Sequence, residues 1–125
     1  MKIRVYYEDT DCGNVVYYAN YLKYMERGRT EFMRERGVSL GDYHKQGFLF
    51  VVAEAHVKYH ASAYYDDLLD LNTQIKDVSH VSIIFFTEIK NEKDVLLVTG
   101  EVKVACINKD GKIKRLPQKI VDILS

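Results

Sequence analysis

The chain has 125 residues, and its 18 Lys and Arg side chains balance 18 Asp and Glu, so the formal net charge is zero. This length fits one compact domain over residues 1–125, and 47% hydrophobic residues with a single proline exclude an intrinsically disordered chain. The lack of a basic excess argues against nucleic acid as a partner.

Membrane insertion and secretion find no support in the sequence. No apolar run approaches the roughly 18 residues that a membrane-spanning helix needs. The first residues enter a strand pattern without the apolar segment of a signal peptide. Cys12 and Cys106 form no CxxC motif. We therefore expect a soluble, cytoplasmic protein whose cysteines are reduced.

The first third of the chain predicts a strand followed by one long helix. Residues 2–8 alternate between apolar and polar side chains, which is typical of a half-buried strand. Turn-forming residues crowd positions 9–14. Apolar residues then recur at helical spacing over residues 18–36, and Gly37 is a plausible helix end. Residues 39–47 are expected to form a short helical turn or loop.

The remainder predicts four strands in succession and a short terminal helix. Alternation of apolar and polar side chains places the strands at residues 53–60, 69–76, 81–90 and 95–107. Asp110 and Gly111 indicate a further turn. Pro117 is expected at the first position of the final helix, because its fixed φ suits that place.

The order of these elements, a strand, a long helix and then a run of strands, indicates an α+β protein rather than a parallel α/β fold. We expect an antiparallel sheet wrapped around the single long helix. Gly28 in the middle of this helix costs about 1 kcal/mol relative to alanine. Close contact between the helix and a strand would explain a glycine at this position.

The densest polar cluster is the run Asp-Thr-Asp-Cys-Gly-Asn at residues 9–14. A calcium loop counted from Asp9 would need Gly at its sixth position and Glu at its twelfth, but Asn14 and Asn20 stand there. One remaining interpretation is a plain Asx turn. The other is a carboxylate held just before a helix N-terminus, whose free N–H groups can hold a developing oxyanion.

Other common catalytic arrangements are missing from the sequence. His56 and His60 lie in a strand pattern, about 13 Å apart, which is too far for one metal ion. There is no Walker A motif and no dinucleotide-binding glycine pattern. We therefore expect neither a metal nor a cofactor.

Residues 7–18, together with Tyr21, Glu26 and Arg27, resemble the signature of the 4-hydroxybenzoyl-CoA thioesterase family. Within it, the chain is most similar to the branch of bacterial acyl-CoA thioesterases associated with the Tol-Pal system. The similarity continues to residues 115–117, so it covers nearly the whole chain. It implies the hotdog fold, hydrolysis of acyl-CoA to free acid and CoA, and a homodimer or homotetramer with active sites between subunits.

The resemblance also implies roles for individual residues. Asp11 would be the catalytic carboxylate, acting as general base or as nucleophile, and Asp9 would be structural. The backbone N–H of Tyr18 would polarise the thioester carbonyl. Many members of the Tol-Pal-associated branch carry His at the position of Tyr18. Substrate contacts are expected from Gly13, Val16, Tyr17, Phe50, Val51, Val52 and, toward the CoA phosphates, His80.

Two alternatives remain at this point. Glu26 is a second candidate carboxylate, although a contact to Lys23 or Thr30 along the helix would give it an ordinary role. The second alternative is that the chain is itself a non-catalytic protein, which binds acyl chains or acyl carriers as a partner in a lipid or envelope assembly. A hydratase is less well supported, because its usual His-containing helix motif is missing.

Overall fold

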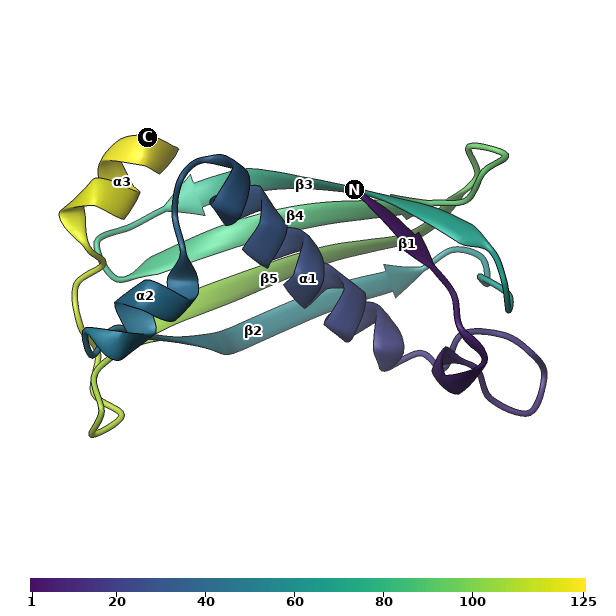
Figure 1. The fold of residues 1–125 in the computed structure, drawn as a ribbon, viewed down its shortest axis with the longest axis horizontal. Coiled ribbons are helices and arrows are strands. Elements are labelled where there is room, and N and C mark those ends of the chain that lie inside the picture. Colours follow the sequence, from purple (N-terminus) through teal and green to yellow (C-terminus); the bar gives the residue numbers. More distant parts are fainter.

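The computed structural model describes residues 1–125 and shows one antiparallel sheet with three α-helices (Figure 1). The strands are β1 (Lys2–Arg4), β2 (Leu49–Tyr59), β3 (Leu68–Val78), β4 (Ser82–Lys90) and β5 (Leu96–Ile107). The helices are α1 (Asn20–Glu35), α2 (Leu40–Lys45) and α3 (Gln118–Leu124), with a 3₁₀ turn at Tyr7–Asp9. The α+β class and the single long helix are confirmed.

The five strands lie in the order β1-β3-β4-β5-β2, and every pairing is antiparallel. The register of β2 against β5 shifts between Val52 and Glu54, which marks a bulge. Strand β2 pairs only with β5 and leaves its other side open along 11 residues. The sheet therefore has a long unpaired edge next to α1.

Helix α1 crosses one face of the sheet (Figure 1) and approaches β3 closely at Gly28. A Cβ atom at this position would lie 2.9 Å from Oγ1 of Thr73 and 3.4 Å from Leu71. The expected close contact between the helix and a strand is therefore confirmed, and Thr73 in β3 is the residue that requires glycine there.

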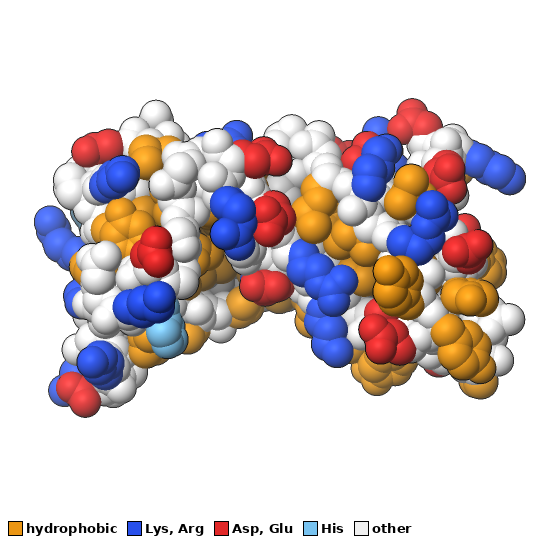
Figure 2. Space-filling view, in the orientation of Figure 1, with side chains coloured by type: hydrophobic (Ala, Val, Ile, Leu, Met, Phe, Trp, Pro, Cys, Tyr) orange, Lys and Arg blue, Asp and Glu red, His pale blue; other side chains and the backbone are white.

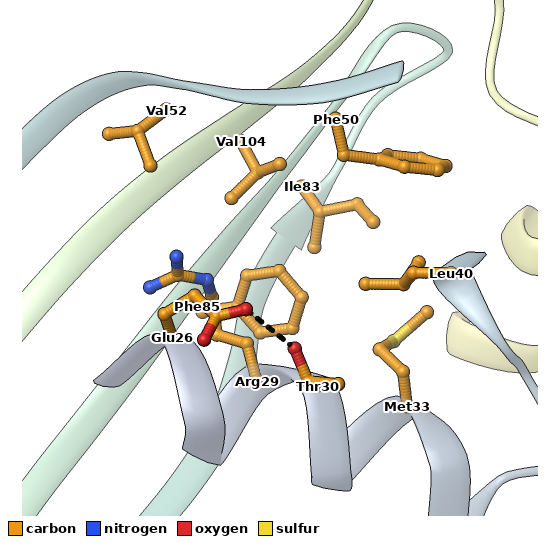
Figure 3. Close-up of a pocket in the computed structure, with 10 residues that line it drawn as sticks. All are labelled: Glu26, Arg29, Thr30, Met33, Leu40, Phe50, Val52, Ile83, Phe85 and Val104. Carbon is orange, nitrogen blue, oxygen red and sulfur yellow. Dashed lines mark hydrogen bonds between the residues drawn. The ribbon is translucent and has the colours of Figure 1, made fainter. Parts of the chain in front are cut away.

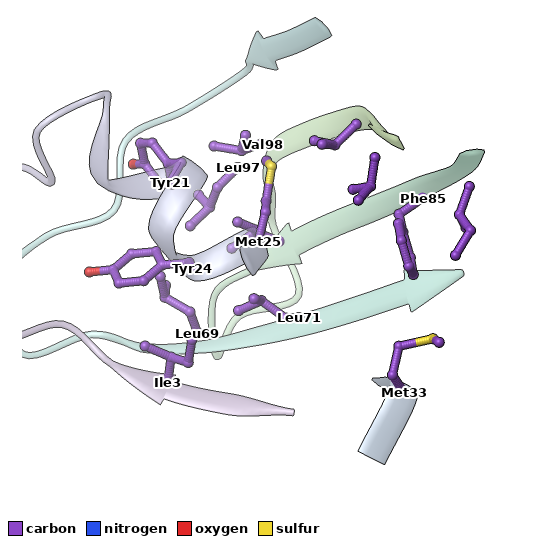
Figure 4. Close-up of a cluster of buried hydrophobic side chains, with 14 of the residues drawn as sticks. Ile3, Tyr21, Tyr24, Met25, Met33, Leu69, Leu71, Phe85, Leu97 and Val98 are labelled. Atoms are coloured by element: carbon purple, nitrogen blue, oxygen red, sulfur yellow. The ribbon is translucent and has the colours of Figure 1, made fainter. Parts of the chain in front are cut away.

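The hydrophobic core lies between α1 and the sheet (Figure 4). The buried face of α1 carries Tyr21, Tyr24, Met25, Gly28, Arg29 and Met33. All but one of these are apolar or small, as the helical periodicity predicts. Arg29 is the exception, and it is the only charged side chain among the buried residues of the chain.

The first strand is shorter than predicted. The Tyr6 backbone N–H donates to the Asp9 carboxylate at 2.8 Å, and the Thr10 hydroxyl donates to the Tyr7 carbonyl at 2.7 Å. These local bonds turn the chain into a 3₁₀ helix, because Asp and Thr side chains compete with strand pairing. Tyr7 consequently points into solvent, with 70% of its surface exposed, instead of continuing the buried face.

Helix boundaries also differ slightly from the predictions. Helix α1 begins at Asn20, so Tyr18 lies in a turn just before the helix. Pro117 is the residue that precedes α3, and its carbonyl accepts the N–H of Ile120 at 3.0 Å. None of the helices combines the length and apolar character needed to cross a membrane.

Candidate active site

The loop that carries Asp11 is a tight turn held by three short hydrogen bonds. The Asp11 N–H donates to the Val15 carbonyl at 3.0 Å, and the Asn14 N–H donates to the Asp11 carbonyl at 3.1 Å. The Gly13 N–H donates to Oδ1 of Asp11 at 3.2 Å, which is an Asx turn. Asn14 adopts a left-handed φ of 59°. Oδ2 of Asp11 has no partner within the chain, so the Asx turn leaves one carboxylate oxygen facing solvent.

Asp9 connects this loop to the start of α1. Its backbone carbonyl accepts the Tyr17 N–H at 2.9 Å and the Asn20 side-chain amide at 2.8 Å. Its carboxylate is already bonded to the N–H of Tyr6. Asp9 is thus occupied by contacts that hold the loop against the helix, as expected for a structural residue.

The turn before α1 presents unsatisfied backbone donors. The N–H groups of Tyr18 and Ala19 have no acceptor within the chain, and Ala19 provides no side-chain cap. Free N–H groups at a helix N-terminus carry partial positive charge and attract anionic oxygen. The Tyr59 hydroxyl donates to the Tyr18 carbonyl at 3.2 Å, which fixes this turn against the end of β2.

Tyrosine side chains surround the turn. The rings of Tyr17 and Tyr18 lie 4.8 Å apart, and Tyr18 meets Tyr59 edge to face at 6.3 Å. The adjacent Tyr18 phenol raises the pKa of Tyr17, with a smaller contribution from the negative charge of Asp11. Figure 2 shows hydrophobic side chains gathered at this end of the molecule.

A second feature is a cavity of about 90 Å³ between α1 and strands β2, β4 and β5 (Figure 3). Its walls combine apolar side chains with a short polar strip from the helix: Glu26, Arg29, Thr30, Met33, Leu40, Phe50, Val52, Ile83, Phe85 and Val104. In the polar strip, the Thr30 hydroxyl donates to the Glu26 carboxylate at 3.0 Å. The ordinary i,i+4 contact considered for Glu26 is therefore present.

The expected lining residues of β2 divide between two faces. Phe50 and Val52 both contact the cavity. Val51 does not, because successive side chains of a strand point to opposite faces, and Val51 pairs with Ala105 on the outer side. The contact of Val51 with a substrate stays a prediction, and in the single chain Val51 lies on the face of β2 away from this cavity.

Two other residues that were expected to contact the substrate, Val16 and His80, offer their side chains neither to the Asp11 loop nor to the cavity. Val16 is only 5% exposed and packs into the core, so its side chain is not available to a substrate. His80 is exposed in the turn between β3 and β4, where its carbonyl accepts the Leu116 N–H at 2.8 Å. This turn is at the end of the sheet opposite to the Asp11 loop (Figure 1).

The candidate residues thus form two groups at opposite ends of the sheet (Figure 1). Asp11, Gly13, Tyr17 and Tyr18 lie near the C-terminal end of β2, whereas Phe50 and His80 lie near its beginning. The 11 residues of β2 span about 33 Å from the first to the last. One chain therefore does not bring all its expected site residues together.

Sequence reasoning missed Tyr59 and Arg29. Tyr59 showed only the pattern of a strand residue, and its contact with Tyr18 depends on how β2 and α1 meet. Arg29 did carry a signal, because it lies one turn after Met25 on the apolar face of the predicted helix. No three His, Cys, Asp or Glu side chains converge in a way that would hold a metal ion.

Comparison with known proteins shows similarity along the whole chain. Residues 5–124 match the model of the family described as the thioesterase-like superfamily. The acyl-CoA thioester hydrolase YbgC of Escherichia coli O157:H7 is 40% identical over 120 residues, covering 95% of this chain and 90% of that protein. The acyl-CoA thioesterase YbgC of Helicobacter pylori strain J99 is 42% identical over 117 residues, with coverage of 87% and 86%.

Solved structures confirm the hotdog fold. The DHNA-CoA thioesterase of Staphylococcus aureus superposes with a TM-score of 0.92 at 31% identity, covering 98% of this chain and 83% of that one. A protein of Aquifex aeolicus superposes with a TM-score of 0.93 at 25% identity, with coverage of 100% and 98%.

Proposed function

The chain belongs to the thioesterase-like superfamily, and from this premise we propose that it hydrolyses acyl-CoA thioesters to free acid and CoA. The single observation that carries the proposed mechanism is that hydrogen bonds from Tyr17 and Asn20 to the Asp9 carbonyl hold the Asp11 loop to the turn with free N–H groups before α1. Asp11 has an unpartnered carboxylate oxygen, and the N–H of Tyr18 has no acceptor within the chain.

This pair supplies the two things that thioester hydrolysis needs. The carboxylate of Asp11 either removes a proton from the attacking water or attacks the carbonyl carbon itself, forming an anhydride that water then opens. In both routes the carbonyl oxygen becomes negatively charged. The Tyr18 N–H at the positive end of α1 donates to that oxygen and lowers the barrier.

The division of the site into two groups supports an assembly with active sites between subunits. The open edge of β2 can pair with β2 of a second copy around a two-fold axis. Such a pairing is antiparallel, so the beginning of one β2, with Phe50, lies beside the end of the other, with Tyr59. The cavity of one subunit then holds the acyl group of the substrate on which Asp11 of the partner subunit acts.

A homotetramer would use a second surface. The face of the sheet that α1 leaves uncovered carries the half-buried side chains of Ile84 and Phe86 between polar neighbours. An amphipathic sheet face of this kind is suited to pairing with another sheet. In such an assembly the partner's turn between β3 and β4 would offer His80 to the CoA phosphates.

Release of free CoA from a panel of acyl-CoA thioesters tests the function. We expect turnover of at least one aliphatic or aromatic thioester. Asp11→Asn, which keeps size and shape, should lower kcat by roughly 10²–10⁴ with little change in KM. Asp9→Asn should lower kcat less and stability more, since Asp9 holds the loop.

Two outcomes would contradict the proposal. Binding of acyl-CoA without turnover would favour a non-catalytic acyl-binding partner instead. Full activity of Asp11→Asn would exclude Asp11 as base or nucleophile and direct attention to Glu26.

A further inference from the structure

The hydroxyl of Tyr24 is the only buried polar side-chain atom of the chain that has no hydrogen-bond partner. Tyr24 lies in the second turn of α1 and is only 1% exposed. Burying a hydroxyl without a partner costs free energy, and a phenylalanine of nearly the same shape would avoid that cost. A group of this kind in a folded protein needs an explanation, and a role in catalysis is one of the few available.

The position of Tyr24 on the helix indicates Asp9 as its acceptor. Asn20 lies one turn earlier on the same face of α1, and its side-chain amide donates to the Asp9 carbonyl at 2.8 Å. Burial raises the pKa of Tyr24 and the adjacent Asp9 carboxylate raises it further, so the phenol remains a donor. Oδ2 of Asp9 accepts the Tyr6 N–H, whereas Oδ1 accepts no hydrogen bond within the chain. A donor without an acceptor therefore lies near a carboxylate oxygen without a donor.

The ring of Tyr24 is held firmly, so the Asp9 side must move for the two groups to bond. The ring meets Tyr21 edge to face at 6.1 Å, and the Arg27 guanidinium lies 5.9 Å from its centre. Figure 4 shows the ring among core side chains with its oxygen directed out of the apolar cluster. The 3₁₀ turn Tyr7–Asp9, in contrast, contains no buried residue. Segments with few buried contacts shift most easily.

We propose that Tyr24 is a positioning residue, whose hydroxyl donates to Oδ1 of Asp9 in the reacting complex and thereby holds the Asp11 loop in its catalytic position. This inference rests on the proposed function, because it takes Asp11 as the base or nucleophile. The Asp9 carbonyl accepts the Tyr17 N–H, so a shift of Asp9 is transmitted to the loop and to the turn before α1. A hydrogen bond that forms only in the reacting complex raises kcat without tightening substrate binding in the ground state.

Tyr24→Phe tests this role, because it keeps the ring and removes only the hydroxyl. One hydrogen bond to a charged group is worth a factor of roughly 10 to 100, so kcat for an accepted acyl-CoA should fall by about this factor while KM is unchanged. The variant should unfold at the same urea concentration as the wild type or at a higher one, because it loses a buried hydroxyl that has no partner. A tyrosine with a merely structural role would lose stability instead.

Two other tyrosines provide matched controls. The Tyr21 hydroxyl is buried but satisfied, since it accepts the Ala63 N–H at 3.1 Å, so Tyr21→Phe should lower the urea midpoint. Tyr43 lies in α2, near the beginning of β2, where its ring packs against Phe48. Tyr43→Phe removes a phenol hydroxyl far from the Asp11 loop and should leave kcat at the wild-type value.

A double variant shows whether Tyr24 acts through Asp11. In Asp11→Asn there is no catalytic carboxylate to position, so adding Tyr24→Phe should not lower the residual kcat any further. Coupled residues are expected to give such non-additive losses, whereas independent residues give additive ones.

The outcomes separate this inference from the function on which it rests. A Tyr24→Phe variant that is fully active and less stable would show a structural hydroxyl and overturn the inference. A higher KM at unchanged kcat, or additive losses in the double variant, would overturn it as well and leave the thioesterase intact. No hydrolysis of any thioester by the wild type would instead reject the proposed function.

Discussion

The hydroxyl of Tyr59, at the end of β2, donates a hydrogen bond of 3.2 Å to the backbone carbonyl of Tyr18. This bond joins the open edge strand to the turn whose N–H groups face solvent. It links the conformation of the proposed oxyanion donor to the position of β2.

Removing this bond should weaken catalysis without abolishing it. Tyr59→Phe keeps the ring packing against Tyr18 and Tyr21 but loses the donor. One neutral hydrogen bond is worth about 0.5–1.5 kcal/mol, so we expect kcat to fall between about twofold and tenfold. Steady-state kinetics on one thioester checks this, and an unchanged kcat would show that the turn is held without Tyr59.

The side chain of Tyr18 should matter less than its backbone. Tyr18→Phe removes a hydroxyl but no backbone N–H, so kcat should stay within about tenfold of the wild type. Parallel kinetics with Asp11→Asn provides the comparison. If both variants lose activity to the same extent, the phenol takes part in proton transfer or substrate orientation, and the backbone-donor mechanism is wrong.

The pH dependence of kcat should show one rise. A carboxylate must be ionised to act as base or nucleophile, so activity increases through the range in which carboxylic acids ionise. The pKa values of Tyr17 and Tyr59 are raised above that of free tyrosine, so both phenols remain protonated and neutral at pH 8. The profile should therefore be flat from neutral pH to about pH 8. A second inflection near pH 7 would indicate an additional catalytic group.

Two Gly→Ala substitutions should change stability in opposite directions. Gly41→Ala in α2 places its methyl group in nearly open space, 3.9 Å from Oγ of Ser39, and gains up to about 1 kcal/mol of helix propensity. Gly28→Ala gains the same propensity but presses against Oγ1 of Thr73, which is in turn hydrogen-bonded to Thr87 at 3.3 Å. We expect a net loss of about 1–3 kcal/mol in urea unfolding. Equal effects would show that the contact between α1 and β3 relaxes freely.

The proposed pairing through β2 predicts that the neighbouring face of α1 is covered in the assembly. Leu22 is 41% exposed in the single chain and borders the depression beside Val52. Leu22→Glu should weaken association, measured by light scattering at micromolar concentration, and lower activity with it. Ile113→Glu is the control, since Ile113 is 64% exposed beyond the end of β5 and away from α1. Wild type that is fully active as a monomer would contradict an active site between subunits.

Local sequence patterns were sufficient to predict most of the strands and the long helix of this protein. Alternation of side chains predicted the strands, because one face of a sheet is buried, and helical spacing predicted α1. The run at residues 9–14 indicated a turn before a helix, and its similarity to a known family indicated the chemistry of Asp11. The error in the predicted length of β1 also has a local cause. The side chains of Asp9 and Thr10 form hydrogen bonds that replace the predicted end of this strand by a 3₁₀ turn.

The tertiary structure alone decided which of these residues meet. Long-range pairing of β2 with β5 places Phe50 far from Asp11 and brings Tyr59 to Tyr18. The packing of α1 on the sheet buries Arg29 at the rim of a cavity, although in the sequence it stands among other charged residues. Periodicity reports only which face of its own segment a side chain occupies. Contacts between segments depend on register and packing across the whole sheet, and these arise only when the strands assemble.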